Sequence, residues 1–167
     1  MDFKSYMDYL EDRLRNSFDL YKEHTVGDVN FDLYARYYIK SERFFLVKKA
    51  KIYGMENNEH ILLRKHDFIN RNTIEAFANS IISAIDELVV PHPEHMSSFI
   101  TGVLVVDDIS TADGDISDFV KKFKYHKGFS FGLRGWVDVR LLIVSLKDGI
   151  VISNKKGEEV LKLYKVS

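Results

Sequence analysis

The segment Phe99–Val106 constrains the fold most strongly, because it carries no charged residue and is apolar at successive positions. Side chains of a strand point alternately to the two faces of its sheet, so a strand with one wet face alternates polar and apolar residues. A strand that is apolar on both faces must be covered on both. The sequence therefore predicts a sheet with helices packed on it.

Three amphipathic stretches supply candidate helices. The first is predicted from the three- and four-residue spacing of apolar residues over 3–21. In the second, Asn72 and Glu75 match a capping box, and Pro91 and Pro93 end the helix. The third is short, begins at Asp113 or Asp115 and ends by Gly128. The apolar residues of the three stripes are Phe3, Tyr6, Met7, Leu10, Leu14, Phe18 and Tyr21, then Ile74, Phe77, Ala78, Ile81, Ile85 and Leu88, then Ile116, Phe119, Val120 and Phe123.

The remaining apolar segments predict strands over 31–39, 43–53, 60–64, 99–106, 137–146 and 149–153. Gly54 and the Asn57-Asn58 pair suit a turn before the third strand, and Asp148-Gly149 suits a tight turn between the last two. Residues 158–166 fit either a short helix or an edge strand. The predicted order is α-βββ-α-β-α-ββ, an α+β fold with a mainly antiparallel or mixed sheet of about six strands.

Composition sets broad limits on the class of protein. The chain has 167 residues, two prolines that lie close together and no linker-like stretch, which predicts a single domain over 1–167. It has no cysteine, so thiolate nucleophiles, disulfides and cysteine-ligated metals are excluded. The net charge is −1, the N-terminus lacks a signal-peptide core and apolar runs are short. We therefore expect a cytoplasmic protein with no membrane partner and no cofactor.

The segment Lys121–Trp136 is the most unusual part of the chain. It contains four lysines, one arginine, five aromatic residues and three glycines, and it contains no acidic residue. Cations neutralise phosphates, exposed rings stack on bases, and glycine allows close approach of the backbone. This composition predicts an anion or nucleic-acid site formed by Lys124, Lys127, Phe129, Arg134 and Trp136. The structural alternative is that the lysines complement a helix dipole, while the rings belong to the core.

Two other clusters suggest a metal. Carboxylates at 107, 108, 113, 115 and 118 follow the apolar strand, and a metal-dependent enzyme would use Asp107, Asp108 and Asp113. The spacing does not match a calcium-binding loop, and helix capping also explains the last three carboxylates. His92, Glu94 and His95 form the second cluster, which lacks a third histidine at zinc-site spacing. The sequence therefore assigns no metal ligand.

The order of the predicted elements resembles that of the restriction-endonuclease-like core. Those nucleases hold magnesium with an acidic residue on one strand and a Glu/Asp-x-Lys pair on the next. The matching strands here offer Asp32, Glu42 and Glu59, but neither glutamate has a lysine two residues later. Asp138-Val139-Arg140 has the right spacing, with arginine in place of lysine and on a later strand. Element order without these site residues implies no nuclease activity.

The sequence favours a small binding domain without catalytic activity, which contacts an anionic ligand or nucleic acid through residues 121–136. A metal-dependent enzyme of nuclease or hydrolase type, with the acidic stretch 107–118 as its site, is the first alternative. The second is a protein–protein module, such as a homodimer that pairs through an exposed sheet edge.

Overall fold

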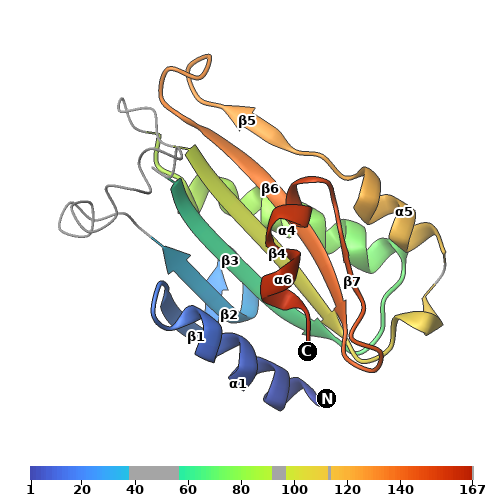
Figure 1. Ribbon diagram of the computed structural model, residues 1–167. Coiled ribbons are helices and arrows are strands. Elements are labelled where there is room, and N and C mark those ends of the chain that lie inside the picture. Colours follow the sequence, from blue (N-terminus) through green and yellow to red (C-terminus); the bar gives the residue numbers. More distant parts are fainter. Residues whose placement is uncertain (38–56, 92–96, 113, 167) are drawn as a thin grey trace.

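The computed structural model describes residues 1–37, 57–91, 97–112 and 114–166. A seven-stranded mixed sheet runs through the molecule in the order β1-β2-β3-β4-β6-β5, and β7 also pairs with β6 (Figure 1). The strands are β1 (Asp19–Val26), β2 (Val29–Tyr37), β3 (Asn57–His66), β4 (Ser97–Val106), β5 (His126–Gly128), β6 (Trp136–Ser145) and β7 (Val151–Ser153). The predicted α+β class with a mixed sheet is confirmed.

The direction of the strands changes across the sheet. β1, β2 and β3 form an antiparallel meander, as expected from short connections. β3, β4 and β6 are parallel to one another, and the short strands β5 and β7 pair antiparallel with β6. Because β3, β4 and β6 are parallel and in register, their first residues, Asn57, Ser97 and Trp136, lie side by side at one end of the sheet.

Helices cover both faces of the sheet (Figure 1). Helix α4 (Arg71–Leu88) crosses behind it in this view, and α5 (Asp115–Lys122) packs on the same side. Helices α1 (Phe3–Leu14) and α6 (Leu161–Tyr164) lie in front, and α6 follows the 3₁₀ helix η2 (Lys156–Val160). A second 3₁₀ helix, η1 (Ile109–Thr111), follows β4. None of the described helices is long and apolar enough to cross a bilayer.

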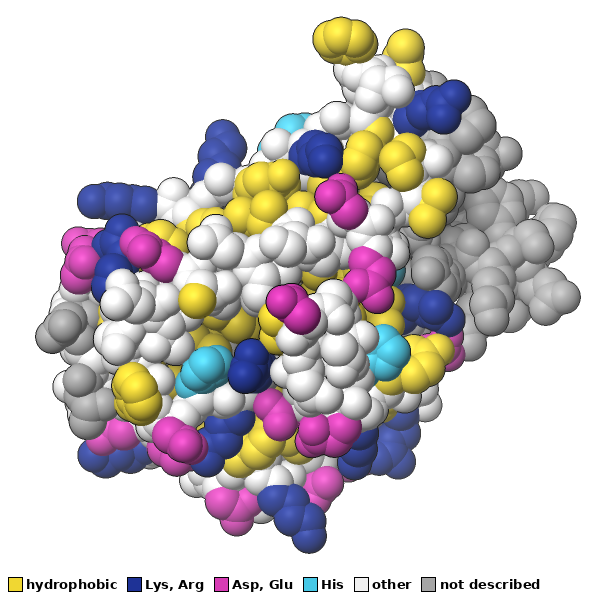
Figure 2. Space-filling view, turned by 180° about the vertical axis from the view of Figure 1, so that it is seen from behind, with side chains coloured by type: hydrophobic (Ala, Val, Ile, Leu, Met, Phe, Trp, Pro, Cys, Tyr) yellow, Lys and Arg dark blue, Asp and Glu magenta, His cyan; other side chains and the backbone are white. Residues whose placement is uncertain are grey.

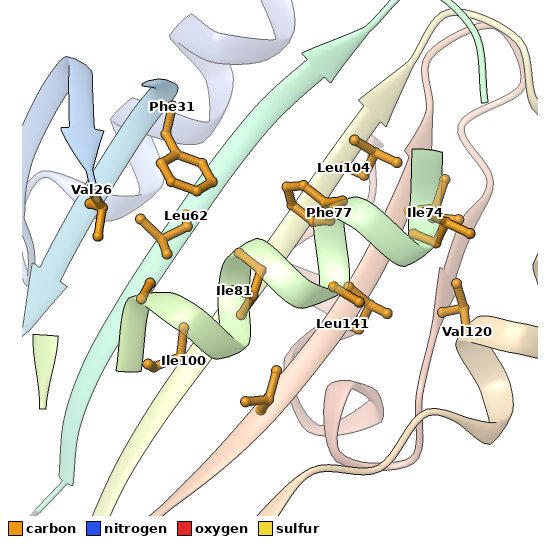
Figure 3. Close-up of a cluster of buried hydrophobic side chains, with 14 of the residues drawn as sticks. Val26, Phe31, Leu62, Ile74, Phe77, Ile81, Ile100, Leu104, Val120 and Leu141 are labelled. Carbon is orange, nitrogen blue, oxygen red and sulfur yellow. The ribbon is translucent and has the colours of Figure 1, made fainter. Parts of the chain in front are cut away.

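The core on the α4 face joins the apolar stripe of this helix to side chains of β1, β2, β3, β4 and β6 (Figure 3). Ile74, Phe77 and Ile81 are buried against side chains such as Ile100 and Leu104 of β4. Gly102 allows this close packing, because a Cβ there would lie 2.7 Å from Cγ1 of Ile81. The predicted apolar face of the second helix and the two-sided burial of 99–106 are therefore confirmed.

The opposite face has a smaller core in which the two ends of the chain meet. Tyr6 of α1 and Tyr164 of α6 are both buried, and the Tyr6 hydroxyl donates to the Tyr164 carbonyl over 3.2 Å. Arg13 of α1 donates to the carbonyl of Lys162 at 2.8 Å. The tail over 158–166 is thus helical, packs on α1 and is not an edge strand.

The first predicted helix is too long. Helix α1 ends at Leu14, and Phe18 and Tyr21 instead lie just before and within β1. The sequence missed β1 because its burial does not alternate: most of its residues are exposed at the edge of the sheet. Asn57 and Asn58 lie inside β3, so the predicted turn at this pair is wrong. The predicted strand over 43–53 lies outside the described residues.

Three helix boundaries also differ from the prediction. Asn70, not Asn72, caps α4, because its side chain accepts from the backbone N–H of Thr73 at 2.8 Å. Helix α5 starts after Gly114 without a side-chain cap and ends at Lys122. Gly128 does not end this helix, because it lies in β5. The Asp148-Gly149 turn is confirmed, with the Asp148 carboxylate accepting from the Ile150 N–H and Gly149 at a φ of 67°.

Candidate functional site

The basic segment 121–136 spans the end of α5, all of β5, a turn and the first residue of β6. It therefore forms one edge of the sheet, along which Lys and Arg side chains project (Figure 2). The five predicted binding residues are spread along this edge. Lys124 lines a hollow near α5, whereas Arg134 and Trp136 belong to the far turn of the β5–β6 hairpin.

Lys127 and Phe129 lie between these two places. The Lys127 ammonium is 3.6 Å from a carboxylate oxygen of Asp86 and 5.4 Å from the ring centroid of Phe129. Phe129 packs against the α4-side core, so much of its ring is not available for stacking on a ligand. Arg134 is exposed, and Trp136 exposes 36% of its surface. The structure thus brings Lys127 and Phe129 together and leaves Lys124 and Arg134 apart.

The hollow beside Lys124 has a volume of about 390 Å³ and is hereafter the lysine pocket. This size falls in the range of small-molecule sites. Among the residues that the structure describes, five lysines and one carboxylate line it. Its lining residues are Lys121, Lys122, Phe123, Lys124, Tyr125, Asp138, Val139, Asn154, Lys155 and Lys156.

The pocket forms because two short strands leave the middle of β6 uncovered. β5 pairs with β6 only over 136–138, and β7 pairs only over 142–144. Between these limits the backbone of β6 is satisfied differently: the Val139 N–H donates to the Tyr125 carbonyl at 3.1 Å. The two segments that flank this gap, 121–125 and 154–156, form the walls of the pocket.

Asn154 closes the rest of the gap with one side chain. Its Oδ1 accepts from the N–H groups of Leu141 and Gly157, each at 3.0 Å. Its Nδ2 donates to the carbonyls of Val139 at 3.1 Å and Phe123 at 3.2 Å. Asn154 is 2% exposed and all four of its hydrogen-bonding positions are used. It therefore holds the three pocket segments together and has no capacity left for a ligand.

The charges of the pocket are unevenly paired. The Lys155 ammonium lies 3.0 Å from Glu158, and the Lys156 ammonium lies 3.8 Å from Glu159. Within the described part of the chain, Lys121, Lys122 and Lys124 form no ion pair. All five lysines are exposed, so their ammonium groups can move toward a ligand. A pocket with several unpaired cations attracts an anion.

Asp138 supplies the carboxylate of the pocket wall and is already engaged. It is 8% exposed, and its Oδ1 accepts from Nδ1 of His126, the residue opposite it on β5, at 2.7 Å. A carboxylate that orients an imidazole leaves the other ring nitrogen, Nε2, for a further contact. The pair therefore adds a polar group next to the lysines.

The neighbouring residue on the same face, Arg140, forms a buried cluster. Arg140 is 4% exposed, and its guanidinium carbon lies 3.9 Å from the ring centroid of Phe99. One terminal nitrogen is 3.5 Å from Glu59 and the other is 2.9 Å from Glu159. The structure thus brings together Glu59 and Arg140, which the search for a nuclease pattern singled out separately. Because the Glu159 pair anchors η2 to the sheet, Arg140 positions Lys156 and the pocket wall.

The acidic stretch places each of its first carboxylates against a lysine. Asp107 is 3.2 Å from Lys65, and Asp108 is 2.5 Å from Lys147. Bonds from Lys147, from the Ser110 hydroxyl and from the Ser110 N–H hold the pKa of Asp108 near 2. Across the ranges that the structure describes, no group of three His, Asp or Glu residues could hold a metal ion. Asp113 and the His92, Glu94 and His95 cluster lie outside those ranges.

Sequence reasoning missed the half of the pocket that comes from the C-terminal segment. Asn154 and Lys155 follow β7, and Lys156 is the first residue of η2, so all three come well after the basic segment in the sequence. Gly157 lies close to Asn154, because a Cβ at Gly157 would be 3.0 Å from Oδ1 of Asn154. In the sequence, however, a lone glycine indicates only a turn and does not reveal this contact. Only the pairing of β6 with β7 brings these residues beside Lys124.

Comparison with known proteins identifies a family without assigning a ligand. No curated protein and no solved structure matches the chain. Residues 2–166 match the family model of a domain of unknown function, DUF8052. This match covers nearly all of the sequence, including every element of the lysine pocket. The chain therefore belongs to the DUF8052 family.

Proposed function

We propose that this domain binds a compact, phosphate-bearing anion in the lysine pocket. The observation that carries the proposal is a hollow of about 390 Å³ with five lysines and a single carboxylate on its walls. Ammonium groups bind phosphates as mobile point charges, and several of them can surround one anion. The volume suits a ligand the size of a nucleotide or a short polyphosphate.

Two of the lysines have a structural role as well. Lys121 and Lys122 lie in the last turn of α5, where cations complement the helix dipole. Lys124, Lys155 and Lys156 lie outside that helix, so the dipole does not explain why they face the same hollow. The binding proposal therefore depends most on Lys124, Lys155 and Lys156.

The test is calorimetric titration with inorganic tripolyphosphate at low salt. The double variant Lys124→Glu/Lys155→Glu should weaken binding at least about tenfold, because each lost charged contact is worth more than one neutral hydrogen bond. The matched control is Lys4→Glu/Lys165→Glu, which makes the same charge change at exposed sites outside the pocket. Equal affinities in the two double variants would show that overall charge, not the pocket, governs binding.

A nucleic-acid ligand gives a different pattern with the same protein. Single-stranded oligonucleotide would have to follow the hairpin edge, so its binding would need Arg134 and Trp136 as well as Lys124. Tripolyphosphate bound in the pocket should be indifferent to Arg134→Glu and Trp136→Ala. Oligonucleotide binding that is lost in both of those variants would favour the extended site that the sequence predicts.

A further inference from the structure

The turn of the β5–β6 hairpin presents apolar side chains to solvent. Phe131 is fully exposed, with a relative exposure of 105%, and Leu133 is 64% exposed. Hydrophobic side chains stand clear of the surface at the end of the molecule where this turn lies (Figures 1 and 2). Single exposed apolar residues are common, but Phe131 and Leu133 lie together at the end of one projecting hairpin, hereafter the tip. Apolar side chains grouped in this way indicate a surface that contacts a partner.

The backbone of the tip is ordered by its own hydrogen bonds. The N–H groups of Phe129 and Arg134 donate to the carbonyls of Gly135 and Phe129 at 2.9 and 3.0 Å, and the Leu133 N–H donates to the Ser130 carbonyl at 3.0 Å. Ser130 and Phe131 have φ angles of 50° and 56°, in the left-handed region that favours glycine. Phe131 thus occupies a position where glycine would be less strained and where its ring makes no packing contact. Strain retained at an exposed position is a sign of function.

The charges behind the tip are cationic. No acidic residue occurs over 121–136, and Arg134 stands beside Leu133 without an ion pair to any described residue. Lys124 lies further along the same edge, and the Lys127 ammonium forms an ion pair with Asp86. The tip therefore has apolar groups at its end and cations behind them, the order in which a bilayer presents acyl chains beneath anionic headgroups.

We infer that the hairpin tip docks reversibly on an anionic lipid surface, with Phe131 and Leu133 in the interface and Arg134 among the headgroups. Leu133 decides against nucleic acid, because an aliphatic side chain cannot stack on bases and a wedge between base pairs must first unstack them. The sequence predicts no membrane partner from the net charge of the whole chain and from its short apolar runs. Neither property reports on the few side chains at the end of one hairpin. A contact of this kind requires no spanning helix.

Trp136 provides a direct optical probe, because it is the only tryptophan and lies at the base of the tip. Its emission should shift to shorter wavelength with vesicles of phosphatidylcholine and phosphatidylserine, and much less with phosphatidylcholine alone. The protein should also sediment with the anionic vesicles. Phe131→Ser/Leu133→Ser should reduce the sedimented fraction at least about tenfold, since two apolar side chains no longer leave water.

The matched control is Phe68→Ser/Ile150→Ser, which removes two exposed apolar side chains from the opposite end of the parallel strands. It should bind vesicles like the wild type. Phe131→Gly is a second tip variant that relieves the left-handed strain, so its loss of binding cannot be attributed to misfolding. Wild-type protein that does not sediment with anionic vesicles at low salt would overturn the inference. So would equal binding by the tip and control variants, or a tip-dependent dimer in light scattering without vesicle binding.

This inference is independent of the lysine pocket. The tip variants should bind tripolyphosphate with wild-type affinity, because no tip residue lines the pocket. Failure of the vesicle experiment with intact tripolyphosphate binding would therefore remove the lipid contact and leave the proposed function unaffected.

Discussion

At the scale of single residues, Asn154 has the clearest structural role in the pocket. Asn154→Ala leaves the N–H groups of Leu141 and Gly157 and the carbonyls of Val139 and Phe123 without this partner, in a buried place. We expect the free energy of unfolding in urea to fall by about 2 to 4 kcal/mol. Asn30→Ala is the control, because Asn30 is exposed and its side chain makes only a 3.3 Å bond to Thr25. A loss no greater than that of the control would mean that Asn154 does not hold the pocket segments together.

His60 predicts how stability depends on pH. It is 1% exposed, its Nδ1 lies 2.9 Å from the Tyr34 hydroxyl, and burial followed by the charge of Arg36 lowers its pKa to about 4. The unfolded chain, with an ordinary histidine pKa near 6.5, takes up a proton before the folded chain does. Stability should therefore be constant above about pH 6.5 and fall by up to about 3 kcal/mol as the pH drops toward 4.

Urea unfolding of wild type and His60→Gln across this pH range checks the assignment. The variant should lose most of the slope, whatever its stability at neutral pH. His66→Gln is the comparison, because desolvation lowers the pKa of His66 too, but this side chain is only partly buried. An unchanged slope in His60→Gln would assign the pH dependence to other groups.

At the scale of elements, two substitutions at the start of α4 distinguish the observed cap, Asn70, from the predicted cap, Asn72. Asn70→Ala removes the bonds from the N–H and hydroxyl of Thr73, at 2.8 and 3.0 Å, and should cost about 1 kcal/mol. Asn72 lies within the first turn, so Asn72→Ala should be neutral or slightly stabilising, since alanine favours helices. Thermal unfolding of the two variants compares them directly. The reverse ranking would restore Asn72 as the cap.

The elements that the sequence predicted well are those whose pattern is set by local burial. Helix α4 is predicted correctly because its apolar residues recur at helical spacing. Strand β4 is predicted correctly because its residues are apolar at successive positions, with no alternation. β1 was missed because Phe18 and Tyr21 continue the helical spacing of α1 by coincidence, and an exposed edge strand has no alternation to reveal it. The predicted cap of α4 lies two residues after the observed one, because several polar residues near Arg71 fit the same capping pattern.

At the scale of the whole molecule, the pairing of β6 with the short strands β5 and β7 decides where the candidate site lies. A run of apolar residues does not say which strand is its neighbour, so the sequence gives no reason to place Lys155 beside Lys124. The basic segment was recognised from its composition alone. Its division into a pocket end and a hairpin end required the three-dimensional path of β5, which pairs over only three residues.

The exposed edges of the sheet are also a whole-molecule property. β1 forms one edge and the short strands β5 and β7 form the other. Short strands are poor templates for pairing with a second chain. On the β5 side, the residues between the two short strands are satisfied within the chain by Tyr125 and Asn154. A homodimer through this edge would therefore have to displace existing hydrogen bonds.

Tripolyphosphate titration across a salt series tests the central claim most directly. Binding in the lysine pocket predicts one site, an affinity that falls as salt rises, and a loss of at least about tenfold in Lys124→Glu/Lys155→Glu with no comparable loss in Lys4→Glu/Lys165→Glu. Absence of binding at low salt, or equal affinity in the two double variants, would contradict it and leave the five lysines as a solvated surface.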